Sequence, residues 1–155
     1  MRQTGIVIQN AVGSLSLDTI GPDLLFAPAN VDPMNPPSAP DGSTHNVNHY
    51  KCYKAKVTPN TLGVPAGVQV SVANGFDAAQ PFVVKKPRHL CVPVDANGEG
   101  IEAPGAYLVC YKVKAPVGSA QYAERPGLKS NDQFGPLELK SLKQAEFCIP
   151  SVLAP

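Results

Sequence analysis

The chain carries the same cysteine framework twice, and this duplication limits its fold more than any other feature. Cys52 and Cys110 are 58 positions apart, and Cys91 and Cys148 are 57 apart. Each first cysteine is followed by Tyr-Lys, and each second cysteine by an apolar residue and a proline. A repeat of this period indicates tandem structural modules, each built on its own pair of cysteines.

The two full copies predict one repeat module over residues 49–100 and another over residues 101–155, either as two small domains or fused into one sandwich. A third, partial copy precedes them, because a shift of 122 positions aligns residues 6–29 with the second half of the last module. Phe26 falls at the position of a cysteine in that alignment. Residues 1–29 therefore look like half a repeat, whose open strand edge is a template for strand addition. We expect a piece of a longer array that associates with itself or with other repeats.

Residues 30–48 differ in composition from the modules. They are rich in proline, asparagine and serine and show no periodicity, which is typical of an extended linker with polyproline II character. We expect a spacer here, and the alternative is a peptide docking motif.

Matched cysteines in a short chain indicate disulfides and an oxidising compartment. The chain is therefore expected to be secreted, extracellular or at the cell surface. Three pairings are open, and the duplication favours Cys52–Cys91 and Cys110–Cys148. Each bond would close a loop of roughly 40 residues and stabilise the fold by about 4 kcal/mol. Free buried cysteines and a zinc site are the alternatives, and the chain has no CxxC spacing for zinc.

Alternation of apolar and polar residues predicts strands throughout. Tyr53, Ala55 and Val57 share one face of a strand, and Cys52 lies on the other face among lysines. We therefore expect the Tyr/Val face to form the core and the disulfides to lie outside it. Short strands separated by proline and glycine predict an all-β fold of small β-sandwich or barrel-like modules, duplicated with pseudo-twofold symmetry and with little or no helix.

Composition argues against two classes of partner. The formal net charge is +1, tryptophan is absent and aromatic residues make up 6% of the chain, so neither general attraction to polyanions nor base stacking is indicated. No nucleic-acid partner is expected. No apolar run is long enough to span a membrane, so no membrane span is expected either.

The best candidate for a metal site is the segment of residues 95–100. Asp95, Asn97 and Glu99 alternate before Gly100, as ligands do at the start of a calcium loop. Position twelve holds Ala106 where such a loop has glutamate. Calcium is therefore the candidate cofactor, and the alternative is a plain acidic turn between the modules.

Other residues suggest binding functions. Lys54, Lys56, Lys112 and Lys114 form short ladders that fit an anionic polysaccharide or another acidic surface, and a solvated outer face is the alternative. Tyr50, Tyr107 and Tyr122 are candidates for carbohydrate binding. His45 and His49 are spaced for a metal only on a helix, which is not expected there. His89 is expected at the surface.

Catalytic motifs are missing from the sequence. There is no GxSxG, no glycine-rich phosphate loop and no HExxH. We therefore assign no catalytic residues, and a small secreted hydrolase is only the third hypothesis.

The segments His49–Lys56, Lys86–Gly100 and Leu108–Lys114, together with Asn131–Gly135 and Phe147–Ser151, resemble a family of secreted bacterial tandem-repeat proteins. That family is classed as a domain of unknown function. The resemblance covers essentially the whole chain and implies export and a repeat architecture, with no catalytic residues to transfer. The expected function is a non-catalytic extracellular structural or adhesive repeat module, assembling through strand sharing. The alternative is a carbohydrate-binding module with glycans as partners.

Overall fold

The structure is a computed structural model that describes residues 2–43 and 46–154. Those ranges contain strands, turns and loops but no helix, so the prediction of an all-β fold is confirmed. The strands are β1 (Ile6–Asn10), β2 (Gly13–Phe26), β3 (Asn30–Asp32), β4 (His49–Val57), β5 (Gln69–Val72), β6 (Gln80–Val94), β7 (Tyr107–Lys114), β8 (Arg125–Asp132), β9 (Gly135–Ser141) and β10 (Glu146–Leu153).

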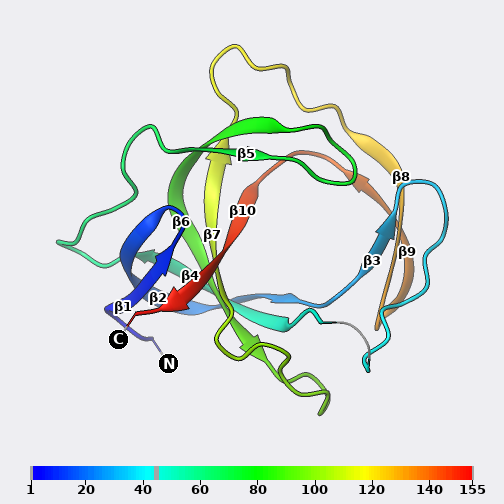
Figure 1. Cartoon of the computed structure of the whole chain (residues 1–155), viewed down its shortest axis with the longest axis horizontal. Helices are drawn as coiled ribbons and strands as arrows, with labels where there is room; N and C mark the ends of the chain where they lie inside the picture. Colours follow the sequence, from blue (N-terminus) through cyan, green and yellow to red (C-terminus); the bar gives the residue numbers. More distant parts are fainter. Residues whose placement is uncertain (1, 44–45, 155) are drawn as a thin grey trace.

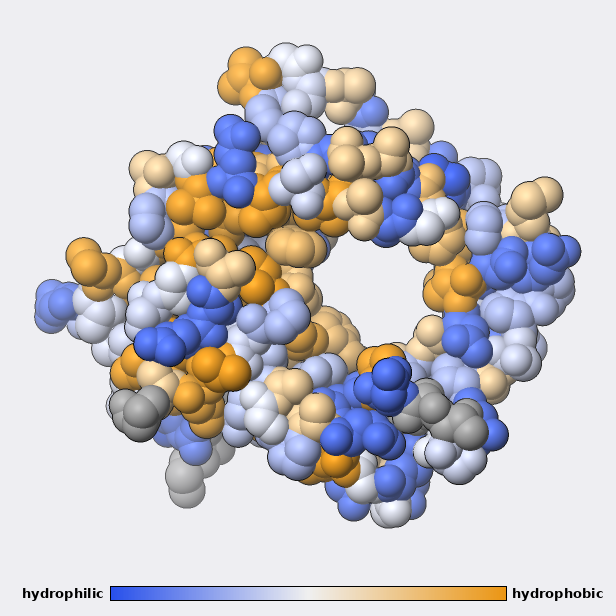
Figure 2. Space-filling view, in the orientation of Figure 1, coloured by the Kyte–Doolittle hydropathy of each residue, from blue (hydrophilic) through white to orange (hydrophobic). Residues whose placement is uncertain are grey.

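Six strands form a closed antiparallel ring in the order β4-β2-β1-β10-β7-β6, because β6 pairs again with β4 (Figure 1). β5 adds to the outer edge of β6. A separate sheet in the order β3-β8-β9 stands beside this barrel. An opening passes through the molecule between the barrel and the second sheet (Figure 2).

The barrel encloses one apolar core. Its side chains lie on the strand faces that the alternation of apolar and polar residues predicted. Its largest fully buried side chain is Tyr111, whose hydroxyl accepts a hydrogen bond from Asn10 Nδ2 at 2.8 Å. Burial raises the pKa of Tyr111. The other buried members are Ile8, Leu15, Leu17, Ala55, Val84, Leu90, Val109 and Ile149.

All three parts of the sequence contribute strands to the same ring. β1 and β2 come from the N-terminal half-repeat, and they lie between β10 and β4. β4 and β6 come from the first full copy, and β7 and β10 from the second. The N-terminal half-repeat is therefore paired within this chain.

One local prediction was wrong. The expected linker over residues 30–48 begins with a strand, since β3 pairs with β8 through Val31 and Ser130. In β2, Gly21 and Pro22 pair with β4 and lie between two register shifts of this continuous strand. Such bulges bend a strand without ending it, so β2 can follow the curve of the barrel.

Asp18 ties the N-terminal hairpin to the end of β4. It is buried, and its Oδ1 accepts hydrogen bonds from Thr58 Oγ1 at 2.7 Å and from Gly5 N at 3.0 Å. These two bonds, the first above all, lower the pKa of Asp18. The ionised carboxylate therefore stabilises the folded state above about pH 4, and this contribution is lost as the pH falls through the lowered pKa.

We expect the variant Asp18→Asn to be less stable than the parent at pH 6, with a difference that shrinks as the pH falls towards 3. Urea unfolding of both proteins at several pH values measures this. The variant Thr58→Val should lose part of the same pH dependence, because it removes the stronger of the two hydrogen bonds. A difference in stability that stays constant with pH would contradict the assignment.

Candidate functional site

Register shifts in β6 push three cationic side chains to the surface. β6 gains extra residues against β7 between Val84 and Pro87, and again between Pro87 and His89. Strict alternation would bury one of two neighbouring side chains, but a bulge redirects them. Lys85, Lys86 and Arg88 are all exposed as a result.

Lys85 and Lys86 meet Lys112 and Lys114 of β7 at a groove of about 530 Å³. Arg88 does not line this groove but lies close enough to lower the pKa of Lys112. The other wall of the groove is apolar and comes mainly from the loop that follows β4. The apolar and small residues that line it are Val57, Gly63, Val64, Pro65, Ala66, Gly67, Val84 and Pro87. The basic groove is therefore a strip of apolar surface bordered by lysines.

No ion pair joins Lys85, Lys86, Arg88, Lys112 or Lys114 to a carboxylate within the described residues. Their mutual repulsion is therefore uncompensated. The pKa of Lys112 is lowered, first by the charge of Lys114 and then by that of Arg88, with desolvation, Lys86 and Lys85 adding to the effect. An anion in the groove would relieve this repulsion.

The four lysines that the sequence singled out lie in two different environments. Lys112 and Lys114 lie in the basic groove, whereas Lys54 forms an ion pair with Asp23 at 3.8 Å. Lys56 lies close enough to Asp18 to lower the pKa of that carboxyl. Lys85, Lys86 and Arg88 were missed as binding residues, although the basic run Lys-Lys-Pro-Arg was a visible signal.

A larger hollow of about 840 Å³ lies between the start of β6, the end of β7 and the loop before β8. Its rim includes Asp77 and Arg125, which form an ion pair with each other at 2.9 Å. Arg125 also donates a hydrogen bond to the carbonyl oxygen of Phe76 at 2.7 Å. These groups hold β8 against the β5–β6 turn, so the basic groove is the better candidate for binding an anion.

The disulfides join directly opposed residues of neighbouring strands. Cys52 pairs with Cys91 across β4 and β6, and Cys110 pairs with Cys148 across β7 and β10. This is the pairing that the duplication favoured.

The disulfides lie outside the main core, as expected, but the outer face that they occupy is covered and not exposed. Cys52, Cys91 and Cys110 have no exposed surface, and Cys91 Sγ lies 3.9 Å from Cys110 Sγ. The cysteines form a second buried cluster on the side of the strands away from the main core. Phe26, Tyr50 and Leu108 pack against it.

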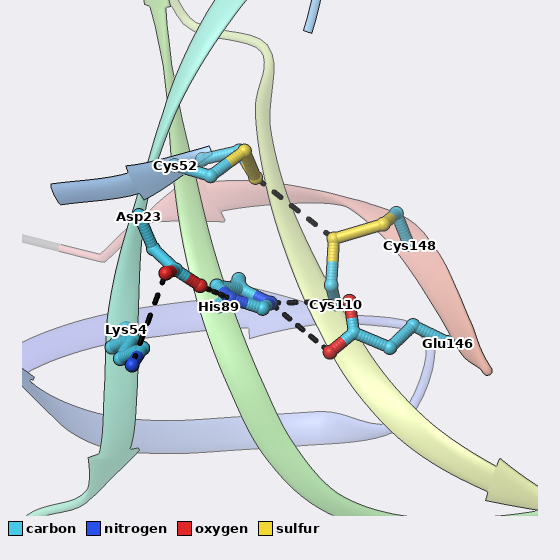
Figure 3. Close-up of polar contacts among 8 residues, drawn as sticks. Asp23, Cys52, Lys54, His89, Cys110, Glu146 and Cys148 are labelled. Carbon is cyan, nitrogen blue, oxygen red and sulfur yellow. Dashed lines mark hydrogen bonds and ion pairs between the residues drawn. A yellow bond between two sulfur atoms is a disulfide. The ribbon is translucent and has the colours of Figure 1, made fainter. Parts of the chain in front are cut away.

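His89 was expected at the surface and is buried instead. Its Nε2 lies 2.6 Å from Asp23 Oδ2, and its Nδ1 lies 3.0 Å from Glu146 Oε1 (Figure 3). Carboxylates only accept hydrogen bonds, so both contacts are satisfied when the ring carries two protons and a positive charge. Such a ring holds β2, β6 and β10 together but has no free nitrogen with which to act as a base.

Two of the candidate calcium ligands, Asp95 and Glu99, make separate contacts. Asp95 Oδ1 accepts a hydrogen bond from Gly100 N at 3.1 Å, which closes the turn. The Glu99 side chain lies against Gly42 instead, and it lines a small pocket with His49 and Gln133. Across the described ranges, no group of three acidic, histidine or cysteine side chains is placed to hold a metal ion.

The remaining candidates have structural contacts. His45 lies outside the described residues, and His49 Nε2 lies 3.0 Å from Gln133 Oε1. Tyr50 and Tyr107 are half-buried, as is Tyr122, whose hydroxyl is hydrogen-bonded to Ser141 Oγ. None of these three tyrosines is fully exposed.

Comparison with known protein families, with curated proteins and with solved structures gave no match. In the described part of the chain, no helix is long and apolar enough to cross a membrane. We therefore infer the function from the chemistry of the chain's own residues.

Proposed function

We propose that this protein is a non-catalytic extracellular adhesive module that binds acidic polysaccharides in the basic groove. The observation that carries the proposal is the set of five cations around the groove that have no carboxylate partner among the described residues. In a chain with a net charge of only +1, this concentration of positive charge on one face favours a local ligand.

An acidic polysaccharide fits the groove in two ways. Its carboxylate or sulfate groups would neutralise Lys85, Lys86, Lys112 and Lys114 at the rim, and hydrogen bonds to charged groups are stronger than neutral ones. The apolar wall around Pro65 offers an apolar surface against which the C–H face of a sugar ring can pack. A disulfide-bonded fold is compatible with an extracellular location, where such polymers occur.

The triple variant Lys85→Gln/Lys112→Gln/Lys114→Gln is expected to bind heparin and polygalacturonate at least about tenfold more weakly than the parent, because it removes most of the charge in the groove. Titration calorimetry or surface plasmon resonance at two salt concentrations measures this. The parent's affinity should fall as salt rises, since screening weakens exposed charge interactions. Binding should also take up protons at alkaline pH, because an anion reverses the lowering of the Lys112 pKa.

The matched control is Lys51→Gln/Lys129→Gln/Lys140→Gln, which changes the net charge equally. Lys129 and Lys140 are paired with Glu138 and Glu124 on the second sheet, and none of the three lines the groove. This control should bind like the parent. Equal weakening in both triple variants would show that binding follows net charge alone and would reject the groove as the site.

A further inference from the structure

The chain contains the same β-hairpin three times. β1–β2, β5–β6 and β8–β9 occupy equivalent positions in the repeat alignment. In the first, Asn10 pairs with Gly13 across the turn, and in the third, Asp132 pairs with Gly135 in the same way. Deeper in the hairpins the equivalent pairs are Ile6–Leu17, Val70–Phe82 and Leu128–Leu139.

In the first two hairpins, the second strand continues into a pairing with the first strand of the next repeat. β2 pairs with β4 from Leu17, opposite Val57, onwards. β6 pairs with β7 from Val83, opposite Lys114, onwards. The same pairing between neighbouring repeats therefore occurs twice in one chain. Each time, the second strand of the hairpin pairs with a strand that contains Cys-Tyr-Lys.

The third hairpin has no such partner in the described chain. β9 is an edge strand that pairs only with β8. Leu139 is 45% exposed, whereas the equivalent Leu17 and Phe82 are 0% and 6% exposed. Leu137 is 55% exposed, whereas the equivalent Leu15 is 4% exposed. Positions that are buried in the earlier copies thus remain open to water in the last one.

The outer edge of β10 is open in the same region. β1 pairs with β10 only at Val152 and Leu153. The rest of β10 pairs with β7 on one side alone. Cys148 is half-buried there, whereas Cys91, its equivalent in the first module, is fully buried. The opening in Figure 2 lies between this part of the barrel and the second sheet.

We propose that the open edge formed by residues 139–148 binds the first strand of a further copy of the repeat. The two existing interfaces, β2 with β4 and β6 with β7, define its register. Leu139 would lie opposite the Val57 position of the incoming strand, and Glu146 opposite the Cys52 position. Burial of apolar side chains and new strand hydrogen bonds would drive the binding.

The occupant is a strand of the β4 and β7 type that is not yet paired. A second folded copy of this chain does not supply one, because its β4 already pairs with β2 and β6, and its β7 with β10 and β6. The inference is independent of polysaccharide binding, since the basic groove uses β6 and β7.

The probe is a labelled peptide with the sequence of residues 49–57, in which Cys52 is replaced by alanine to prevent disulfide formation. We expect saturable binding to the full chain by fluorescence anisotropy, and slower hydrogen exchange in residues 139–148. The variant Leu139→Asp should bind at least about tenfold more weakly, because its carboxylate would have to be buried against the apolar side chain at the Val57 position. A scrambled peptide of equal charge should not bind.

The control variant is Leu62→Asp, which places the same charge at a side chain that is 88% exposed on a distant loop. It should bind like the parent. Thermal unfolding of both variants shows whether they fold. The proposal fails if the peptide does not saturate, if the scrambled peptide binds equally, or if protection appears at β3 or β5 instead. Concentration-dependent dimers that the peptide does not disperse would also overturn it, because a second copy would then be the occupant.

Discussion

A protein in which Cys52 and Cys91 are both replaced by alanine is expected to lose about 4 kcal/mol of unfolding free energy. The disulfide closes a segment with a sequence separation of 39, and without it the unfolded chain gains the corresponding conformational freedom. Alanine is the suitable replacement because both sulfur atoms are fully buried, and a serine hydroxyl would lack a partner there. Urea unfolding under non-reducing conditions measures the loss, which is a large fraction of a typical domain's stability.

The matched comparison is the pair Cys110→Ala/Cys148→Ala, whose sequence separation of 38 gives nearly the same chain-entropy term. Cys148 is only half-buried, so this pair should lose less packing and be destabilised somewhat less than the first. For the same reason, a mild thiol should reduce Cys110–Cys148 first in the native protein, as mass spectrometry after alkylation would show. Reduction of Cys52–Cys91 first would contradict this order.

The second large effect is expected at His89. The variant His89→Ala should lose about 3 kcal/mol of unfolding free energy, because Asp23 and Glu146 would face each other partly buried without the imidazole that contacts both of them. Chemical denaturation at neutral pH measures this. The triple variant that adds Asp23→Asn and Glu146→Gln should recover part of the loss, since the two neutral amides no longer repel.

The control for this cluster is Lys54→Ala. Lys54 also contacts Asp23, at 3.8 Å, but its side chain is 61% exposed. Exposed ion pairs contribute little, so the loss should stay below about 1 kcal/mol. If the triple variant were no more stable than His89→Ala alone, repulsion between the carboxylates would not be the cause.

The strand pattern could be predicted from alternation, but the burial of the cysteines could not. Alternation correctly placed Cys52 and Cys110 opposite the core face. It says which side of a strand a residue occupies and nothing about what covers that side. The cover comes from Phe26, Tyr50 and Leu108, which lie in three different strands, and only the closed ring brings them together.

The His89 cluster could likewise be predicted from the sequence only in part. Glu146 follows His89 by 57 positions, the offset that relates Cys91 to Cys148, so the repeat itself marked these two residues as equivalent. Asp23 was not predictable, because it lies at a register shift in β2, where the alternation of strand faces is interrupted.

The sequence singled out Lys112 and Lys114, but it did not predict the full basic groove, partly because net charge is a sum over the whole chain. The total of +1 conceals a face with five cations, since acidic residues elsewhere balance them. The strand bulges that expose Lys85, Lys86 and Arg88 together have no local sequence signature beyond Pro87. Alternation alone would have placed neighbouring lysines on opposite faces.

The ring of strands is closed unevenly, and this determines how the molecule would respond to a pulling force. Only two residue pairs join β1 to β10, whereas six join β10 to β7 and six join β4 to β6. Tension applied to the two ends would part β1 from β10 first and then peel the N-terminal hairpin away. Extension would stop at the segments that Cys52–Cys91 and Cys110–Cys148 enclose, because covalent bonds there do not yield. A module of this design would lengthen under load and then hold at its two disulfide-closed segments.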